Sequence, residues 1–212
     1  MRDTIGAVKL FVRLLFAAMW ILIAAAPALA TPEFSPSSVK KGALLVASPS
    51  LTDPNFRETV VLIVEHGDEG TLGLILNRSM KVLLSEALPD LAVLKGTTYR
   101  LFAGGPVDMT RMLLLFRLKD PPPDARSVFD GIYVGGSPKV LERIIVQGKK
   151  DKEAFRVFAG VSGWGPGQLS FEMLQGAWAV LPPDSFNIFD HDPATFWQDC
   201  IAHLQAPRVI SY

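Results

Sequence analysis

The segment TVVLIVEHGDEGTLGLILNR, residues 59–78, decides the fold of this chain. Two runs of β-branched and other apolar residues, 59–66 and 71–78, flank the polar tetrapeptide GDEG. Runs with this spacing predict an antiparallel hairpin whose loop is GDEG. Both runs are almost continuously apolar, so we expect a sheet that is covered on both of its faces.

Strand-like runs outnumber helical patterns in the rest of the chain. Further strands are predicted at residues 43–50, 99–105, 111–118, 131–136, 153–163 and 177–182. Helices are predicted at residues 79–88, 137–148, 168–175 and 192–204. Because the strands adjoin one another and do not alternate strictly with helices, we expect a single α+β domain with a mixed sheet.

The first 30 residues have the three-part pattern of a secretory signal peptide. A basic region precedes an uncharged apolar stretch, which ends in a small-residue A-x-A site at 28–30. Pro27 and this site favour cleavage, and hence a periplasmic or secreted protein. The alternative is an uncleaved membrane anchor, because the uncharged stretch 14–30 nearly reaches the length that spans a bilayer. Contact with a membrane is expected only through residues 1–30, if they are retained.

The sequence after this segment predicts one domain with balanced charge. Residues 31–41 are rich in Pro and Ser and predict a flexible leader, and residues 42–212 predict the folded domain. Of 21 Lys and Arg and 21 Asp and Glu, three basic residues and one acidic residue lie in 1–30, which leaves 18 against 20. Direct binding to nucleic acid is therefore not expected. Cys200 is the only cysteine, so no intramolecular disulfide can support an exported fold.

Four segments, in this order along the chain, resemble the AlgH/YqgE family: residues 42–78, FAGGPV at 102–107, GIYVGG at 131–136 and residues 160–182. The resemblance covers nearly the whole chain that follows the leader. It implies an α+β fold with a mixed, barrel-like sheet and a few packed helices. The family is bacterial with plant relatives, and its members are often labelled transcriptional regulators without a described chemistry.

The signal-like N-terminus departs from the family pattern, because most family members lack a leader. A functional signal would place the protein in the periplasm, away from DNA. The alternative is a start codon assigned upstream of the true one, since VKKG at 39–42 lies where family members usually begin. The protein would then be cytoplasmic. Random upstream sequence rarely reproduces a three-part signal, so we expect export.

A first group of candidate ligand-binding residues contains Asp53, Asn55, Arg57 and His66. In one interpretation Asp53 and His66 form an acid–base pair while Arg57 holds an anionic ligand. In the interpretation that we favour, Asp53 and Asn55 bond to their own backbone in a turn, and Arg57 pairs with a carboxylate. No nucleophile is evident beside the pair, which argues against catalysis.

A second group contains the glycine-rich loops AGGPV, with Gly104 and Gly105, and SGWGPGQ, with Gly163, Trp164 and Gln168. Such loops can present backbone N–H groups to an anion at the start of a helix. They lack the residues of a P-loop and the spacing of a dinucleotide site. We therefore favour an architectural role, in which Trp164 buries its ring over the sheet while the glycines form the corner.

A metal site and a cofactor are not expected. His191, Cys200 and His203 could supply three zinc ligands, but no fourth ligand accompanies them by spacing, and a Cys on an amphipathic helix usually belongs to the core. No serine lies in a G-x-S-x-G elbow. The sequence thus offers no recognisable catalytic motif.

These observations predict a non-catalytic binding or regulatory protein that is exported to the periplasm. We expect its ligand, a small anionic molecule or a protein partner, where the loops at 53–57, 104–107 and 163–168 meet. One alternative is a hydrolase-type enzyme that uses Asp53 and His66. Another is a transcription-related regulator, as the family label suggests, although the balanced charge and the absence of a helix-turn-helix pattern argue against direct DNA contact.

Overall fold

The hairpin predicted at 59–78 is present in a computed structural model, which describes residues 38–135, 137–147 and 155–206. Strand β2 (Val60–Gly67) pairs antiparallel with β3 (Gly70–Ile75). The loop is shorter than predicted, because Gly67 pairs with Gly70 and the ladder continues almost to the tip. Gly70 has a φ of 127°, which side-chain-bearing residues rarely adopt, and so permits this tight closure.

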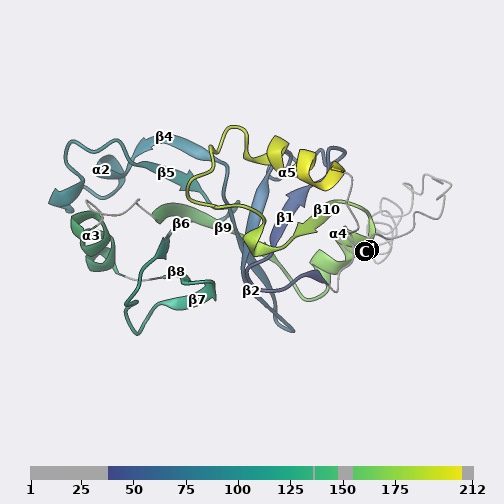
Figure 1. Ribbon diagram of the computed structural model, residues 1–212, viewed down its shortest axis with the longest axis horizontal. Coiled ribbons are helices and arrows are strands. Elements are labelled where there is room, and N and C mark those ends of the chain that lie inside the picture. The colour runs from purple at the N-terminus through teal and green to yellow at the C-terminus, as the bar shows by residue number, and fades with distance from the viewer. Residues whose placement is uncertain (1–37, 136, 148–154, 207–212) are drawn as a thin grey trace, which may run out of the picture. The chain divides into compact units, whose positions relative to one another are not determined.

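The strands form one ten-stranded sheet in the order β10-β1-β2-β3-β9-β6-β8-β7; off this path β5 pairs with β9, and β4 pairs with β5 (Figure 1). The remaining strands are β1 (Leu44–Ala47), β4 (Ser79–Leu83), β5 (Arg100–Ala103), β6 (Val107–Arg117), β7 (Arg126–Phe129), β8 (Ile132–Val134), β9 (Phe155–Trp164) and β10 (Trp178–Leu181). Neighbouring strands are antiparallel, except that β5 runs parallel to β9. The prediction of an α+β fold with a mixed sheet is thus confirmed.

The sheet does not close into a barrel, since no ladder joins β10 to β7 in the described residues. The β7–β8 end of the sheet nevertheless shares a core with its other half. Val128 of β7 and Val134 of β8 are buried in the same cluster as Leu62 of β2. An ion pair between Arg126 and Glu65 also links β7 to β2. The barrel-like character that the family resemblance implies therefore corresponds to an open sheet whose two ends share one apolar core.

The helices are α2 (Leu84–Ala87), α3 (Pro138–Gln147), α4 (Gln168–Leu174) and α5 (Phe196–Gln205), with 3-10 turns η3 (Ala92–Leu94) and η4 (Pro183–Ser185). They contribute to three core clusters: α5 to the first, α4 to the second, and α2 and α3 to the third. Helix α5 is fastened to β1 by Trp197, whose Nε1 donates to the Ala47 carbonyl at 2.8 Å. None of the helices in the described part of the chain is long and apolar enough to span a membrane.

Two helix boundaries differ from the prediction. Residues 79–83, predicted as helix, form β4, because pairing with β5 overrides the helical apolar pattern. The last helix begins at Phe196 instead of Asp192. Asp192 does cap a turn, since its Oδ1 accepts a hydrogen bond from the Ala194 backbone nitrogen at 2.9 Å.

The predicted burial of both sheet faces is confirmed on β2. Val60, Leu62 and Val64 belong to one core cluster, whereas Val61 and Ile63 belong to another. This alternation follows from the two-residue period of a strand. Burying a side chain of this size stabilises the fold by about 1.5–3 kcal/mol, so this strand anchors the domain.

The predictions for the N-terminus concern residues outside the described part of the chain. These are the signal peptide or anchor at residues 1–30 and all but the end of the leader at 31–41. They stay predictions.

Candidate functional site

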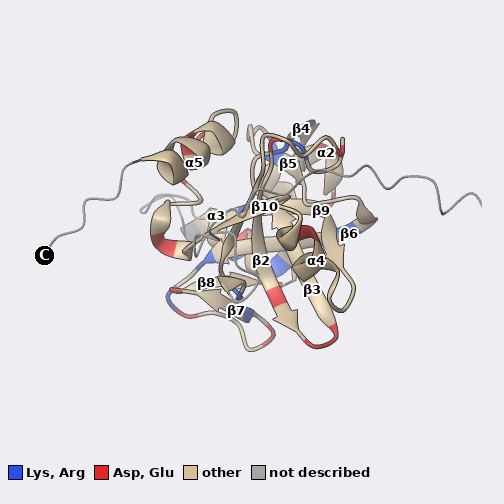
Figure 2. Cartoon of the chain, turned by 90° about the vertical axis from the view of Figure 1, so that its right-hand side faces the viewer, with Lys and Arg blue, Asp and Glu red and all other residues tan. Residues whose placement is uncertain are grey.

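A pocket lies between the tip of the β2–β3 hairpin and the turn that leads into α4. Its volume is about 490 Å³, within the range of roughly 300–1,000 Å³ typical of small-molecule sites. We call it the hairpin pocket, and its lining residues are His66, Gly67, Asp68, Gly70, Thr71, Gly165, Gly167, Leu169 and Ser170. Acidic residues mark the hairpin tip beside it (Figure 2).

His66 is the one predicted ligand-binding residue that lines the hairpin pocket. It pairs across the hairpin with Thr71, and its Nδ1 lies 2.8 Å from the Thr71 hydroxyl oxygen. The Thr71 side chain is buried, so this bond fixes one ring nitrogen against the sheet. Nε2 has no hydrogen bond within the described residues, which leaves it as the ring nitrogen that can meet a ligand.

Trp164 forms the wall behind the turn. It ends β9, pairs with Thr71 and is only 4% exposed. Its Nε1 donates to Glu172 Oε2 at 2.9 Å, and Trp178 Nε1 donates to the same oxygen at 2.9 Å. Because one carboxylate oxygen accepts two indole N–H groups, β9, α4 and β10 are held in a fixed arrangement. The architectural interpretation of Trp164 agrees with this geometry.

Gln168 fixes the turn itself. Its Oε1 accepts a hydrogen bond from the Gly165 backbone nitrogen at 3.1 Å, and its Nε2 donates to Glu172 Oε1 at 3.0 Å. The side chain is therefore occupied by intramolecular bonds. Gly163 lies within β9, one residue before Trp164, and does not line the pocket.

The loop that contains Asp53 and Asn55 is closed by local bonds. Asp53 Oδ1 accepts the Asn55 backbone N–H at 2.8 Å, as the turn interpretation predicts. The Arg78 guanidinium donates to the carbonyls of Asn55 at 2.6 Å, Pro54 at 3.0 Å and Arg57 at 3.3 Å. Burial lowers the pKa of Arg78, and the nearby charge of Arg57 lowers it further.

Arg57 itself has no ion pair within the described residues, so the predicted carboxylate partner is absent there. Its loop reaches the sheet through Phe56. The Phe56 ring stacks on Trp164 with centroids 5.7 Å apart and meets Trp178 edge-on at 5.5 Å. The loops at 53–57 and 163–168 therefore meet, as predicted, but the contact between them is aromatic packing of Phe56 on Trp164.

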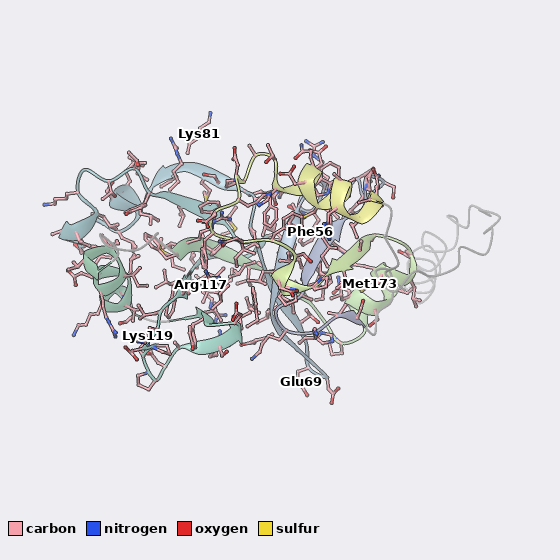
Figure 3. The ribbon with its side chains drawn as sticks, in the orientation of Figure 1. Phe56, Glu69, Lys81, Arg117, Lys119 and Met173 are labelled. Atoms are coloured by element: carbon pink, nitrogen blue, oxygen red, sulfur yellow. The ribbon has the colours of Figure 1, made fainter. Side chains whose placement is uncertain are left out.

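Asp53 and His66 are not brought together. The Asp53 loop lies beside Val60 at the start of β2, whereas His66 lies near its end. Val60 and His66 are six positions apart on this strand, which is about 20 Å at ~3.3 Å per residue. Figure 3 shows Phe56 of this loop well apart from Glu69 at the hairpin tip. No hydrogen bond or ion pair joins Asp53 to His66 within the described residues, so the structure gives the alternative acid–base pair no support.

Gly104 and Gly105 lie against the backbone of β9. A Cβ on Gly104 would sit 2.3 Å from the Gly160 carbonyl oxygen, and one on Gly105 would sit 2.3 Å from the Ser162 nitrogen. Ser162 Oγ also donates to the Gly104 carbonyl at 3.0 Å. The requirement for glycine at both positions thus has a packing reason, and neither residue lines the hairpin pocket.

The three residues weighed as zinc ligands have other surroundings. Cys200 is fully buried, and burial raises the pKa of its thiol to about 12. His191 Nε2 lies 3.1 Å from Asp199 Oδ2, and the His203 ring meets Phe186 with centroids 5.4 Å apart. In the described part of the chain no three His, Cys, Asp or Glu side chains are placed to hold a metal ion.

Sequence reasoning missed Arg156, a buried cation on β9. Its guanidinium donates to the carbonyls of Leu76 at 2.8 Å and His191 at 3.1 Å, and lies 4.9 Å from the centre of the Phe102 ring. Burial lowers its pKa to about 10. Arg156 therefore fastens the segment around His191 to Leu76, the residue that follows β3. It does not line the hairpin pocket.

Comparison with known proteins shows a family to which the sequence of this chain is similar. A family model described as AlgH-like matches residues 44–208. A UPF0301 protein of Streptomyces avermitilis is 36% identical over 172 residues, which cover 76% of this chain and 84% of that protein. A UPF0301 protein of Chlorobium limicola is 36% identical over 159 residues, covering 75% and 83%.

Two solved structures have a similar fold. The solution structure of the AlgH protein from Pseudomonas aeruginosa aligns with a TM-score of 0.63 and 26% identity, covering 85% of this chain and 94% of that one. The crystal structure of a Corynebacterium diphtheriae protein aligns with a TM-score of 0.58, covering 76% and 85%. Its identity of 23% makes it evidence for the fold alone.

Proposed function

This chain belongs to the AlgH-like family, and we propose that it is a binding protein whose ligand occupies the hairpin pocket. The observation that carries the proposal is the cavity of about 490 Å³ beside His66, in which a small molecule fits. The predicted site at the Asp53 loop is less well supported, because that loop is closed by its own hydrogen bonds and by Phe56.

The walls of the pocket are held before any ligand binds. The Thr71 hydroxyl orients His66 on one side, and the Gln168 side chain closes the turn at Gly165 on the other. Behind that turn, Glu172 joins two strands through their tryptophans. A preorganised wall lowers the entropic cost of binding, which favours recognition by this surface.

The lining suits a small polar ligand with an acidic group. The Ser170 hydroxyl is a donor for such a group, and so is His66 Nε2 in the tautomer whose Nδ1 accepts the Thr71 hydroxyl proton, while Asp68 disfavours a multiply charged anion. Binding is favoured over catalysis, because no hydrogen bond links His66 to Ser170 or Asp68 within the described residues. A small monocarboxylate is thus the ligand class that we propose.

We also propose that the protein acts after export. The support is the three-part signal pattern of residues 1–30 together with the near-neutral charge of the rest of the chain. N-terminal sequencing of the protein from fractionated cells tests this. A periplasmic chain that begins at Thr31 supports export, whereas a cytoplasmic chain that begins near Val39 overturns it.

A pocket-filling variant tests the binding proposal. Ser170 is exposed on α4 and lines the pocket, so Ser170→Trp should fill the cavity without disturbing the core. Gln175→Trp is the matched control, because Gln175 is exposed next to the same helix but outside the pocket. Isothermal titration with a panel of small monocarboxylates, and with glucose as a neutral control, measures binding.

We expect wild type and Gln175→Trp to bind at least one monocarboxylate and Ser170→Trp to lose that binding, with similar melting temperatures for all three. Binding that survives Ser170→Trp would move the site elsewhere. Absence of binding by the wild type to every probe would contradict the proposed ligand class.

A further inference from the structure

One carboxylate of the hairpin pocket is uncompensated. Asp68 lines the pocket together with His66 and Ser170, and it is exposed. Asp68 makes no ion pair and no side-chain hydrogen bond within the described residues. Neither Lys nor Arg is among the described residues that line the pocket. The charge of Asp68 is therefore accessible to a ligand and is not neutralised by the pocket itself.

The hairpin fixes the position of this carboxylate. Gly67 pairs with Gly70, so Asp68 and Glu69 alone form the loop. Asp68 follows His66 by two positions, and both residues line the pocket. Glu69 does not line it, and Figure 3 shows this residue at the outer end of the hairpin. The two acidic residues of the loop therefore differ in their surroundings, although they are neighbours in sequence.

Neutral hydrogen-bond donors lie on both walls of the pocket. Ser170 supplies a hydroxyl from α4. His66 supplies Nε2 from β2, in the tautomer whose Nδ1 accepts the Thr71 hydroxyl proton. The pocket thus combines two donors that suit a carboxylate with one negative charge that repels it.

This combination narrows the ligand class, on the premise of the proposed function that the pocket holds a monocarboxylate. A carboxylate bound beside Asp68 meets a like charge, which weakens its binding. A ligand that also carries an ammonium group brings the missing positive charge with it. Its ammonium group can donate charge-assisted hydrogen bonds to Asp68 and so offset the repulsion.

We propose that the ligand of the hairpin pocket is a free amino acid, a zwitterion with one carboxylate and one ammonium group. Its carboxylate accepts hydrogen bonds from Ser170 and His66, while its ammonium group pairs with Asp68. The cavity of about 490 Å³ leaves room for the side chain of the amino acid beside these groups. Asp68 is then the residue that distinguishes an amino acid from a simple carboxylate.

Three probes of similar size separate the contributions of the two charged groups. Alanine carries both groups, propionate only the carboxylate and ethylamine only the ammonium group. Isothermal titration at neutral pH and low salt measures the binding of each probe. We expect wild type to bind alanine about fivefold more tightly than propionate, which is the effect of one exposed ion pair. Ethylamine should bind more weakly than alanine, because it lacks the group that Ser170 and His66 recognise.

Two variants of the loop test the role of Asp68. Asp68→Asn removes the charge and keeps a side chain that turns accept, so it should bind alanine and propionate equally. It should also bind propionate more tightly than wild type does. Glu69→Gln is the matched control, because it removes the neighbouring charge outside the pocket, and it should keep most of the preference for alanine. Melting temperatures check the fold, and Asp68→Ser is a second neutral variant if Asp68→Asn melts early.

The outcomes separate this inference from the proposed function. A preference for alanine that Asp68→Asn abolishes and Glu69→Gln keeps supports the inference. A wild type that binds propionate as tightly as alanine overturns the inference and leaves the monocarboxylate site standing. A preference that survives in Asp68→Asn also overturns it, because another group then holds the ammonium. Ethylamine that binds as tightly as alanine overturns both, because the carboxylate then contributes nothing.

Discussion

Replacing Glu172 with alanine removes the shared acceptor of two buried indole groups. Trp164 and Trp178 are 4% and 1% exposed, and each Nε1 lies 2.9 Å from Glu172 Oε2. Leaving a buried donor without a partner costs roughly 1–3 kcal/mol, so two donors cost about 2–6 kcal/mol. Glu172 is only half-buried, and water can replace part of the loss. We therefore expect about 3 kcal/mol of destabilisation.

Urea unfolding followed by tryptophan fluorescence measures this loss, since Trp164 and Trp178 are buried in one core cluster and Trp197 packs against it. In a chain of this length 1 kcal/mol corresponds to roughly 2–4 °C in melting temperature, so Glu172→Ala should melt about 6–12 °C below wild type. Glu172→Gln keeps an oxygen acceptor and loses only the charge. Its cost should be about 1 kcal/mol.

Glu142→Ala is the matched control, because Glu142 is an exposed carboxylate on α3. We expect it to change stability by less than about 0.5 kcal/mol. If Glu172→Ala behaves like Glu142→Ala, the shared carboxylate does not hold the two tryptophans together. The wall of the hairpin pocket is then not preorganised by Glu172.

Two further predictions concern packing and pH. Gly105→Ala places a Cβ 2.3 Å from a backbone nitrogen of β9 at a φ of +154°, and it should lower the free energy of unfolding in urea by about 3 kcal/mol or more. Gly67→Ala is the control, because its Cβ would meet nothing within 4 Å, and it should be nearly neutral. Equal effects of the two substitutions would refute the packing role of Gly105. Burial raises the pKa of Cys200 from 9.0 to about 12, so only the unfolded state loses the thiol proton between these values. The contribution of Cys200 to the free energy of unfolding should therefore be intact below pH 9 and fall by up to about 1.4 kcal/mol per pH unit above it. Cys200→Ala should lack this pH-dependent fall. An identical pH profile for the variant and the wild type would contradict the prediction.

Much of the sheet follows from local patterns. The apolar runs around GDEG predict the β2–β3 hairpin, in which His66 pairs with Thr71. β4 could not be predicted in this way, since residues 79–83 fit a helical pattern and become a strand only by pairing with β5. Contacts between distant segments decide such cases.

The candidate site was harder to predict for the same reason. Asp53 and His66 are near in sequence, but Asp53 precedes β2 whereas His66 lies near the end of that strand, and no hydrogen bond or ion pair joins them in the described residues. The role of Glu172 as a shared acceptor could not be predicted from nearby residues. It depends on Trp164 and Trp178, which lie on two different strands and donate to the same carboxylate oxygen. The glycines of AGGPV allow either an anion-binding loop or an architectural role in the sequence, and only the structure shows that β9 fills the space beside them.

The most direct test of the binding proposal is a ¹H–¹⁵N chemical-shift map of the full chain titrated with the monocarboxylate that binds best. Glycine amides are well resolved in such spectra and mark both candidate sites. We predict that the largest shifts fall on Gly67, Gly70, Gly165 and Gly167, which line the hairpin pocket. Shifts centred on residues 53–57, or on Gly104 and Gly105, would contradict the account.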